Sequence, residues 1–216
     1  MRILETLAAG GIVMVPLLGF SIGAIGLIAE RLVFWSRINR RQRQVAIEVL
    51  RLYQQDPDAA VAKIKQNLDL PITRIFLEAL AIDQLSPTGF QLALEAATQT
   101  EIPLLKRFNT FFEIVVTASP LLGLLGTVLG LIRSFASVNL GNIAAQNAGD
   151  VTSGISEALV STAAGIIVAV FTLVFARTFR GFYQRQLTLI REFGSQLELL
   201  YLHRYENGVE KPYARP

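Results

Sequence analysis

The chain has 216 residues, of which 52% are hydrophobic and 17% are charged, and its net charge is +3. The absence of cysteine excludes disulfides and thiolate chemistry. Because the charges are unevenly placed along so apolar a chain, the composition indicates a membrane protein with a sizeable water-exposed part.

Three long runs carry no charge: Leu7–Ala29 with 23 residues, Ile114–Ile132 with 19 and Ala158–Ala176 with 19. A helix needs roughly 20 apolar residues to cross the hydrocarbon core. The runs therefore predict three transmembrane helices. The first is too long for a signal peptide and its basic residues follow it, so we expect an uncleaved span.

The basic residues predict the orientation of these spans. Of the 20 Lys and Arg residues, 11 lie in 31–107 and seven in 177–216, which leaves Arg2 and Arg133. Positive residues stay in the cytoplasm, so the N-terminus is predicted outside and the C-terminus inside. This topology accounts for the positive charge, and nucleic-acid binding need not be invoked.

The predicted fold is an all-α membrane protein in which long helices extend into the cytoplasm. Its parts follow in chain order: the outer N-terminus and first span (1–34), a cytoplasmic helical region (35–109), the second span (110–135), an outer loop (136–150), the third span (151–177), and a cytoplasmic C-terminal helix and tail (178–216).

Prolines in the cytoplasmic region predict where its helices begin and bend. Asp56-Pro57-Asp58 and Pro71 each favour a helix start. Ser86–Gly89 reads as a turn, and a last helix is expected from about Phe90 into the second span, with Pro103 and Pro120 as bends. About 70 residues of short helices are too few for an independent catalytic domain with a deep cleft.

Small residues gather on one face of the second span. Gly123, Gly126, Gly130 and Ser134 follow at steps of three, four and four. Such a face lets another helix approach closely. Thr127 adds a hydroxyl beside it, and Pro120 opens the stretch. Helix packing alone explains any one of these glycines. The whole series on one face is a more specific signal of close contact with another helix.

The third span opens with Glu157, the only carboxylate near a membrane-embedded position. If the helix starts near Val151, Glu157 lies about 9 Å along it, at about 1.5 Å per residue, in the outer leaflet. Charges at such depths are costly and usually mark ion or proton pathways. An interfacial glutamate that reaches the headgroups or pairs with a neighbouring subunit explains the position equally well.

Other candidates carry less signal. Thr127 and Thr162 either face a polar pathway or bond to their own backbone one turn back. His203 is expected at the surface, and Gly165 to pack against another helix. The sequence contains no nucleophile–base set, metal cluster, phosphate loop or dinucleotide fingerprint, so neither an enzyme nor a cofactor is predicted.

The stretches Pro120–Phe135 and Ile155–Gly165 resemble the two signature helices of the MotA/TolQ/ExbB proton-channel family. Three spans with the N-terminus outside are similar to the ExbB and TolQ branch, whereas MotA proteins have four spans. The length and the ending Arg133-Ser134-Phe135 favour the ExbB-like branch, which serves TonB, over the TolQ branch, which serves envelope maintenance.

The resemblance implies a bacterial inner-membrane ring. Five copies would surround two single-span ExbD-like helices, whose membrane aspartate takes and releases protons, the coupling ion. A TonB-like protein would receive the motion. Thr127 and Thr162 would be pore-facing hydroxyls near that aspartate, and Glu157 would serve proton passage or subunit contact.

Two other functions stay open to different degrees. A structural scaffold would use the same glycines but would have no need of Glu157 at its depth. A solute transporter is disfavoured, because the chain has neither an internal repeat nor a pair of broken helices.

Overall fold

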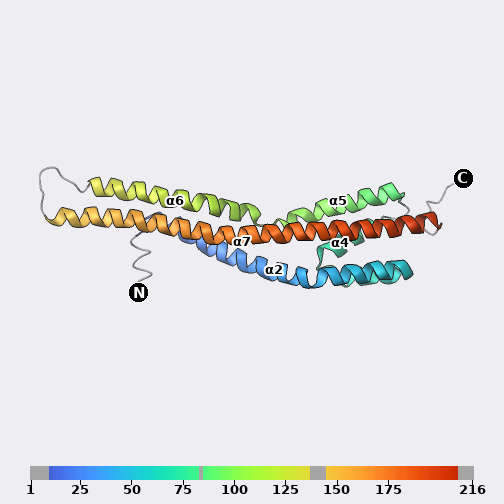
Figure 1. The fold of residues 1–216 in the computed structure, drawn as a ribbon. Coiled ribbons are helices and arrows are strands. Elements are labelled where there is room, and N and C mark those ends of the chain that lie inside the picture. The colour runs from blue at the N-terminus through green and yellow to red at the C-terminus, as the bar shows by residue number, and fades with distance from the viewer. Residues whose placement is uncertain (1–9, 83–84, 137–144, 209–216) are drawn as a thin grey trace. The chain divides into compact units, whose positions relative to one another are not determined.

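The computed structural model describes residues 10–82, 85–136 and 145–208. Within these ranges every regular element is a helix, which confirms the all-α prediction (Figure 1). The helices are α2 (Met14–Gln55), α3 (Pro57–Lys65), α4 (Pro71–Leu80), α5 (Pro87–Leu105), α6 (Asn109–Ala136) and α7 (Ala145–Glu206).

The chain divides into two compact units. Unit 1 takes Met1–Arg31 and Phe108–Phe179, and unit 2 takes Leu32–Arg107 and Arg180–Pro216, so α2 and α7 contribute residues to both. Three helical stretches in the described part are long and apolar enough to cross a membrane, as the charge-free runs predict: Met14–Gln55, Pro87–Ala136 and Val151–Glu206.

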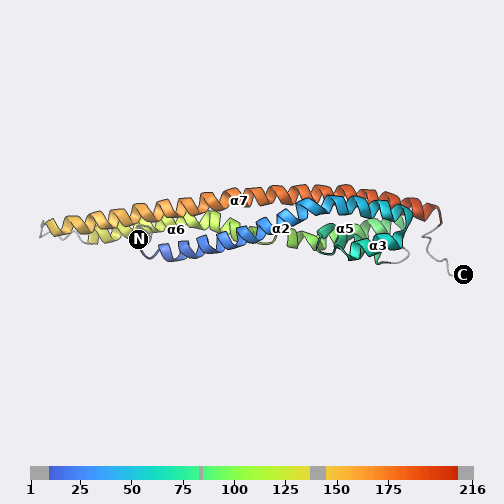
Figure 2. The same cartoon turned by 90° about the horizontal axis from the view of Figure 1, so that it is seen from below.

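Unit 1 is built on the pairing of α6 with α7, which lie side by side in both views (Figures 1 and 2). The start of α2 packs onto this pair, because Val13, Met14 and Leu17 are buried against Leu122, Leu129 and Ala164. Large apolar side chains remain exposed on the outer faces, including Val15, Ile22, Leu121, Phe135 and Ile167. Such surfaces suit lipid or neighbouring protein.

The first span begins later than its charge-free run. The chain turns at Gly11, whose φ is 70°, and α2 starts at Met14. Glycine adopts this left-handed conformation without the steric cost that a Cβ brings. The predicted residues 7–9 lie outside the described part of the chain.

The predicted outer loop, 136–150, is also shorter than expected. Helix α6 ends at Ala136 and α7 already begins at Ala145, while 137–144 fall outside the described ranges. At the other end, α7 stops at Glu206, and most of the predicted tail, 209–216, is likewise outside them.

Unit 2 gathers α3, α4 and α5 with the polar parts of α2 and α7. Its core is aromatic and aliphatic, and its fully buried side chains include Trp35, Tyr53, Phe76, Phe90 and Leu197. The C-terminal part of α7 turns one apolar face into this core, because Ile190, Phe193, Leu197 and Tyr201 are all buried.

The predicted helix starts at Pro57 and Pro71 are confirmed. Helix α5 starts at Pro87, ahead of the expected Phe90, because the Ser86 hydroxyl caps it by accepting a hydrogen bond from the Gly89 amide at 3.1 Å.

The expectation of one helix running from Phe90 into the second span is wrong. The chain breaks after α5, and Phe108 takes a φ of 68° before α6 begins. Pro103 and Pro120 lie inside α5 and α6, away from the break.

Asp56 caps α3, and its removal should weaken that helix. Its carboxylate accepts hydrogen bonds from the amides of Asp58 at 3.0 Å and Ala59 at 3.2 Å. We expect Asp56→Ala to destabilise α3 by about 1 kcal/mol, measured as faster hydrogen exchange of its amides. Asp58→Ala, which removes a carboxylate from the same turn, is the control and should have a smaller effect; equal effects would contradict the capping role.

Candidate functional site

Helices α6 and α7 meet through their backbones. Gly123, Gly126, Gly130 and Ser134, the small face of α6, are all buried. A Cβ added to Gly130 would lie 2.6 Å from the Gly154 carbonyl oxygen, and one added to Gly123 would lie 3.0 Å from that of Ser161. The close approach that the spacing predicts is thus made within one chain, and we call this contact the α6–α7 seam.

Gly165 occupies the tightest part of the seam that α7 contributes. A Cβ there would collide with the Ser119 carbonyl oxygen and lie 3.2 Å from the Gly123 backbone. Pro120 is half-buried next to this contact. Ser119 is fully buried, and its hydroxyl has no hydrogen-bond partner among the residues that the structure describes.

The two threonines singled out from the sequence differ in their partners. The Thr162 hydroxyl crosses the seam and donates to the Gly123 carbonyl at 3.0 Å. The Thr127 hydroxyl donates to Leu124 of its own helix at 2.6 Å, the backbone alternative raised above. Both residues are half-buried, so each keeps part of its side chain accessible in the single chain.

Glu157 forms an ion pair with Arg133. The Arg133 Nη1 lies 2.7 Å from one carboxylate oxygen of Glu157 and 2.8 Å from the other. The Glu157 side chain is 15% exposed, whereas that of Arg133 is 57% exposed. The carboxylate therefore lies under a guanidinium that reaches it from the exposed side.

Sequence reasoning missed this pair, although a signal existed. Arg133 ends the charge-poor part of the second span and Glu157 opens the third, 24 residues later. Two antiparallel helices joined by a short connection place such positions at the same level. Within one chain, the negative charge of Glu157 is thus paired with Arg133. The sequence alone suggested lipid headgroups or a neighbouring subunit as its partner.

The backbone at Gly11 covers the same carboxylate. A Cβ on Gly11 would coincide with an oxygen of Glu157 and lie 2.6 Å from its Cδ. Three segments of unit 1 thus meet at Glu157: the turn before α2, the last turn of α6 and the α7 residues around Glu157 itself. Gly11 was not predicted as a site residue.

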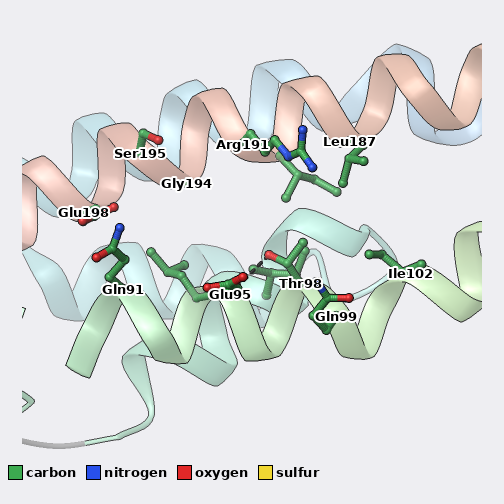
Figure 3. A pocket seen from close by; sticks show the side chains of 13 residues that line it. Gln91, Glu95, Thr98, Gln99, Ile102, Leu187, Arg191, Gly194, Ser195 and Glu198 are labelled. Carbon is green, nitrogen blue, oxygen red and sulfur yellow. Dashed lines mark hydrogen bonds between the residues drawn. The ribbon is translucent and has the colours of Figure 1, made fainter. Parts of the chain in front are cut away.

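Unit 2 holds a hollow of about 280 Å³ that residues of α5 and α7 line (Figure 3), together with Ile75 of α4. Its lining mixes polar and aliphatic side chains, with Glu95, Glu198 and Arg191 as its charges. Within the described ranges, no group of three or more His, Cys, Asp or Glu side chains could hold a metal ion. The lone histidine, His203, is exposed, as expected.

Comparisons with known proteins agree on one family. The MotA/TolQ/ExbB proton channel family matches residues 67–192. An ExbB-like biopolymer transport protein of Synechocystis, ExbB-like 3, is 58% identical over 95% of this chain and 98% of its own length.

More distant relatives come from both branches of that family. The Tol-Pal system protein TolQ of Pseudomonas aeruginosa is 29% identical over 68% of this chain and 60% of its own length. The biopolymer transport protein ExbB of Salmonella typhimurium is 28% identical over 72% of this chain and 70% of its own length. With its apolar helices and these relatives, the chain is a multi-pass membrane protein that belongs to the MotA/TolQ/ExbB proton channel family.

Proposed function

We propose that this chain is an ExbB-like subunit of a motor that uses the proton-motive force in the bacterial inner membrane. With an ExbD-like partner it would energise TonB-dependent transport across the outer membrane. The 58% identity to an ExbB-like protein over nearly the whole chain supports this branch. The N-terminus would lie in the periplasm and the C-terminus in the cytoplasm, since 18 of the 20 basic residues would then be cytoplasmic.

The observation that carries the proposal is the α6–α7 seam, which the Thr162 hydroxyl crosses. Glu157 and its partner Arg133 lie beside this seam, and Thr127 follows Gly126 on α6. Two helices held this closely make a continuous wall, and five copies would enclose a lumen. Glu157 is already engaged by Arg133, so a proton relay through this wall needs a second acid. A single-span partner, present in two copies, would supply it.

The energetics are adequate for movement. One proton crossing about 100 mV releases about 2.3 kcal/mol. A few protons per step therefore supply enough free energy to move a partner between packed arrangements that differ by a few kcal/mol.

Proton flux through the complex with its ExbD-like partner tests the proposal. In proteoliposomes, the double variant Thr127→Val and Thr162→Val is expected to lower flux about tenfold, the factor that about 1.4 kcal/mol produces. Thr117→Val is the matched control, because Thr117 also lies on α6 and bonds its own helix, to Glu113, at 2.8 Å.

Assembly is measured on the same samples by particle mass. If the double variant conducts protons at the wild-type rate, the Thr127 and Thr162 hydroxyls are not part of the proton pathway. Absence of proton flux in the wild-type complex would overturn the channel function itself. A scaffold would be supported if Glu157→Gln left proton-driven transport unchanged.

A TolQ-like role in the Tol-Pal envelope system is the second candidate, because the TolQ relative matches about as well as the ExbB of Salmonella typhimurium. Purifying the complex from its own host separates the two: an ExbD-like subunit and a TonB-like protein support the first, and a TolR-like subunit supports the second.

A further inference from the structure

The carboxylate of Glu157 is closed in from two sides. The Gly11 backbone lies so close to it that even a methyl group would not fit between them. On the other side the Arg133 Nη1 contacts both oxygens, at 2.7 and 2.8 Å. The Glu157 side chain is consequently only 15% exposed.

The two covers differ in how readily they can move. Gly11 belongs to the backbone turn that starts the chain's packing onto α6 and α7, next to the buried Val13, Met14 and Leu17. Arg133 is a long side chain that is 57% exposed in the single chain, so it can rotate away from Glu157 without displacing these buried side chains. Its guanidinium is therefore the movable cover of Glu157.

We propose that Arg133 is a positioning residue that gates Glu157. Paired, it closes the seam to protons at the level of Glu157, since a fixed guanidinium also repels cations that approach it. Turned away, it uncovers the carboxylate for proton exchange. The role in conduction rests on the proposed function; the covering of Glu157 by Arg133 does not.

The covering is tested by the reactivity of Glu157. The purified full-length chain is treated with dicyclohexylcarbodiimide, which modifies accessible carboxylic acids in apolar surroundings, and labelling at residue 157 is followed by mass spectrometry. Arg133→Gln is expected to label about three- to tenfold faster than wild type, as the loss of one charge-assisted contact would give. Arg133→Lys keeps a cation at the position and should stay near the wild-type rate.

Two further variants make the comparison sharp. Arg177→Gln makes the same charge change elsewhere on unit 1, on an exposed arginine of α7, and should label as wild type does. Glu157→Gln must abolish the label, which verifies its site. Equal labelling of Arg133→Gln, Arg177→Gln and wild type would overturn the proposal.

Proton flux separates this inference from the proposed function. In proteoliposomes with the ExbD-like partner, Arg133→Gln is expected to raise resting flux about three- to tenfold per assembled particle. If the ion pair merely stabilised the fold, its loss in Arg133→Gln would lower thermal stability and leave flux and labelling per particle unchanged. If Arg133→Gln labels faster but no sample conducts protons, wild type included, the proposed channel function is wrong and the covering of Glu157 by Arg133 is supported. If the wild type conducts protons but labelling is unchanged in Arg133→Gln, the channel function is supported and the covering is wrong.

If Arg133→Gln accumulates poorly, the charge-reversed pair Arg133→Glu with Glu157→Arg provides the second route. It restores the ion pair with its partners exchanged, so the carboxylate at residue 133 should label faster than the wild-type Glu157. Residue 133 is the more exposed of the two positions. Slower labelling there than at wild-type Glu157 would contradict the geometry.

Discussion

Gly165→Ala is expected to lower the free energy of unfolding of unit 1 by about 3 kcal/mol or more, at the top of the range for overpacking. The new methyl group would meet the Ser119 carbonyl and the Gly123 backbone. These obstacles belong to the α6 main chain and cannot rotate away as a side chain would. Relief requires α6 and α7 to separate, which also loosens the Thr162 hydrogen bond to Gly123.

The measurement is thermal unfolding of the purified chain in detergent, together with the yield of folded protein. Gly181→Ala on the same helix is the matched control, because a Cβ there would meet nothing within 4 Å. It should be neutral or stabilising by about 0.5–1 kcal/mol, since alanine is the better helix former. Similar losses in both variants would show that helix propensity, and not the seam, governs the effect.

Arg74→Met is expected to destabilise unit 2 by about 3–5 kcal/mol, because it leaves a buried carboxylate without its counter-ion. Arg74 donates from Nε and Nη2 to the two oxygens of Glu101, both at 2.6 Å, and from Nη1 to the Leu68 carbonyl at 2.8 Å. The Glu101 side chain is only 8% exposed. Adding Glu101→Gln to Arg74→Met should recover part of the loss.

A surface ion pair serves as the comparison for this variant. Arg41 bonds Asp69 at 2.8 Å, but the two side chains are 47% and 36% exposed. Arg41→Met should therefore cost about 1 kcal/mol or less. Chemical denaturation of the purified chain, followed by circular dichroism, measures all of these variants, and equal losses for Arg74→Met and Arg41→Met would refute the argument from burial.

The contribution that the charge of Arg74 makes to the stability of the wild-type chain should not vary with pH near neutrality. The hydrogen bonds to Glu101 raise the pKa of Arg74, against the opposing effect of burial. A folded-state pKa above the unfolded one gives a contribution that is complete at lower pH and is lost only as pH rises through the folded value. For an arginine this window lies far above pH 9, so denaturation of the wild-type chain should show no loss of stability from Arg74 between about pH 6 and about pH 9.

The fold followed largely from local signals. Charge-free runs of membrane length identify the apolar helices, and Pro57 and Pro71 mark the starts of α3 and α4. The break at Phe108 could not be predicted, because phenylalanine rarely takes a positive φ and Pro103 and Pro120 are the stronger local signals.

The site was predictable only in part, for a different reason. Glycine spacing identifies the face of α6 that another helix approaches, but it does not say which helix, and the structure gives that role to α7. The Arg133–Glu157 pair and the Gly11 turn depend on segments far apart in sequence. Their contacts follow from the depth at which each segment lies; the edges of the charge-free runs indicate this depth for Arg133 and Glu157, but no local pattern indicates it for Gly11.

The seam also determines where movement can take place. Since α6 and α7 touch main chain to main chain, we expect them to shift together as one rigid body. The remaining surface of the pair carries bulky aliphatic groups such as Leu121, Leu124 and Ile167. Such groups repack at low energetic cost, so sliding against lipid or against other chains would be absorbed there, while the spacing of the two helices stays constant throughout a working cycle.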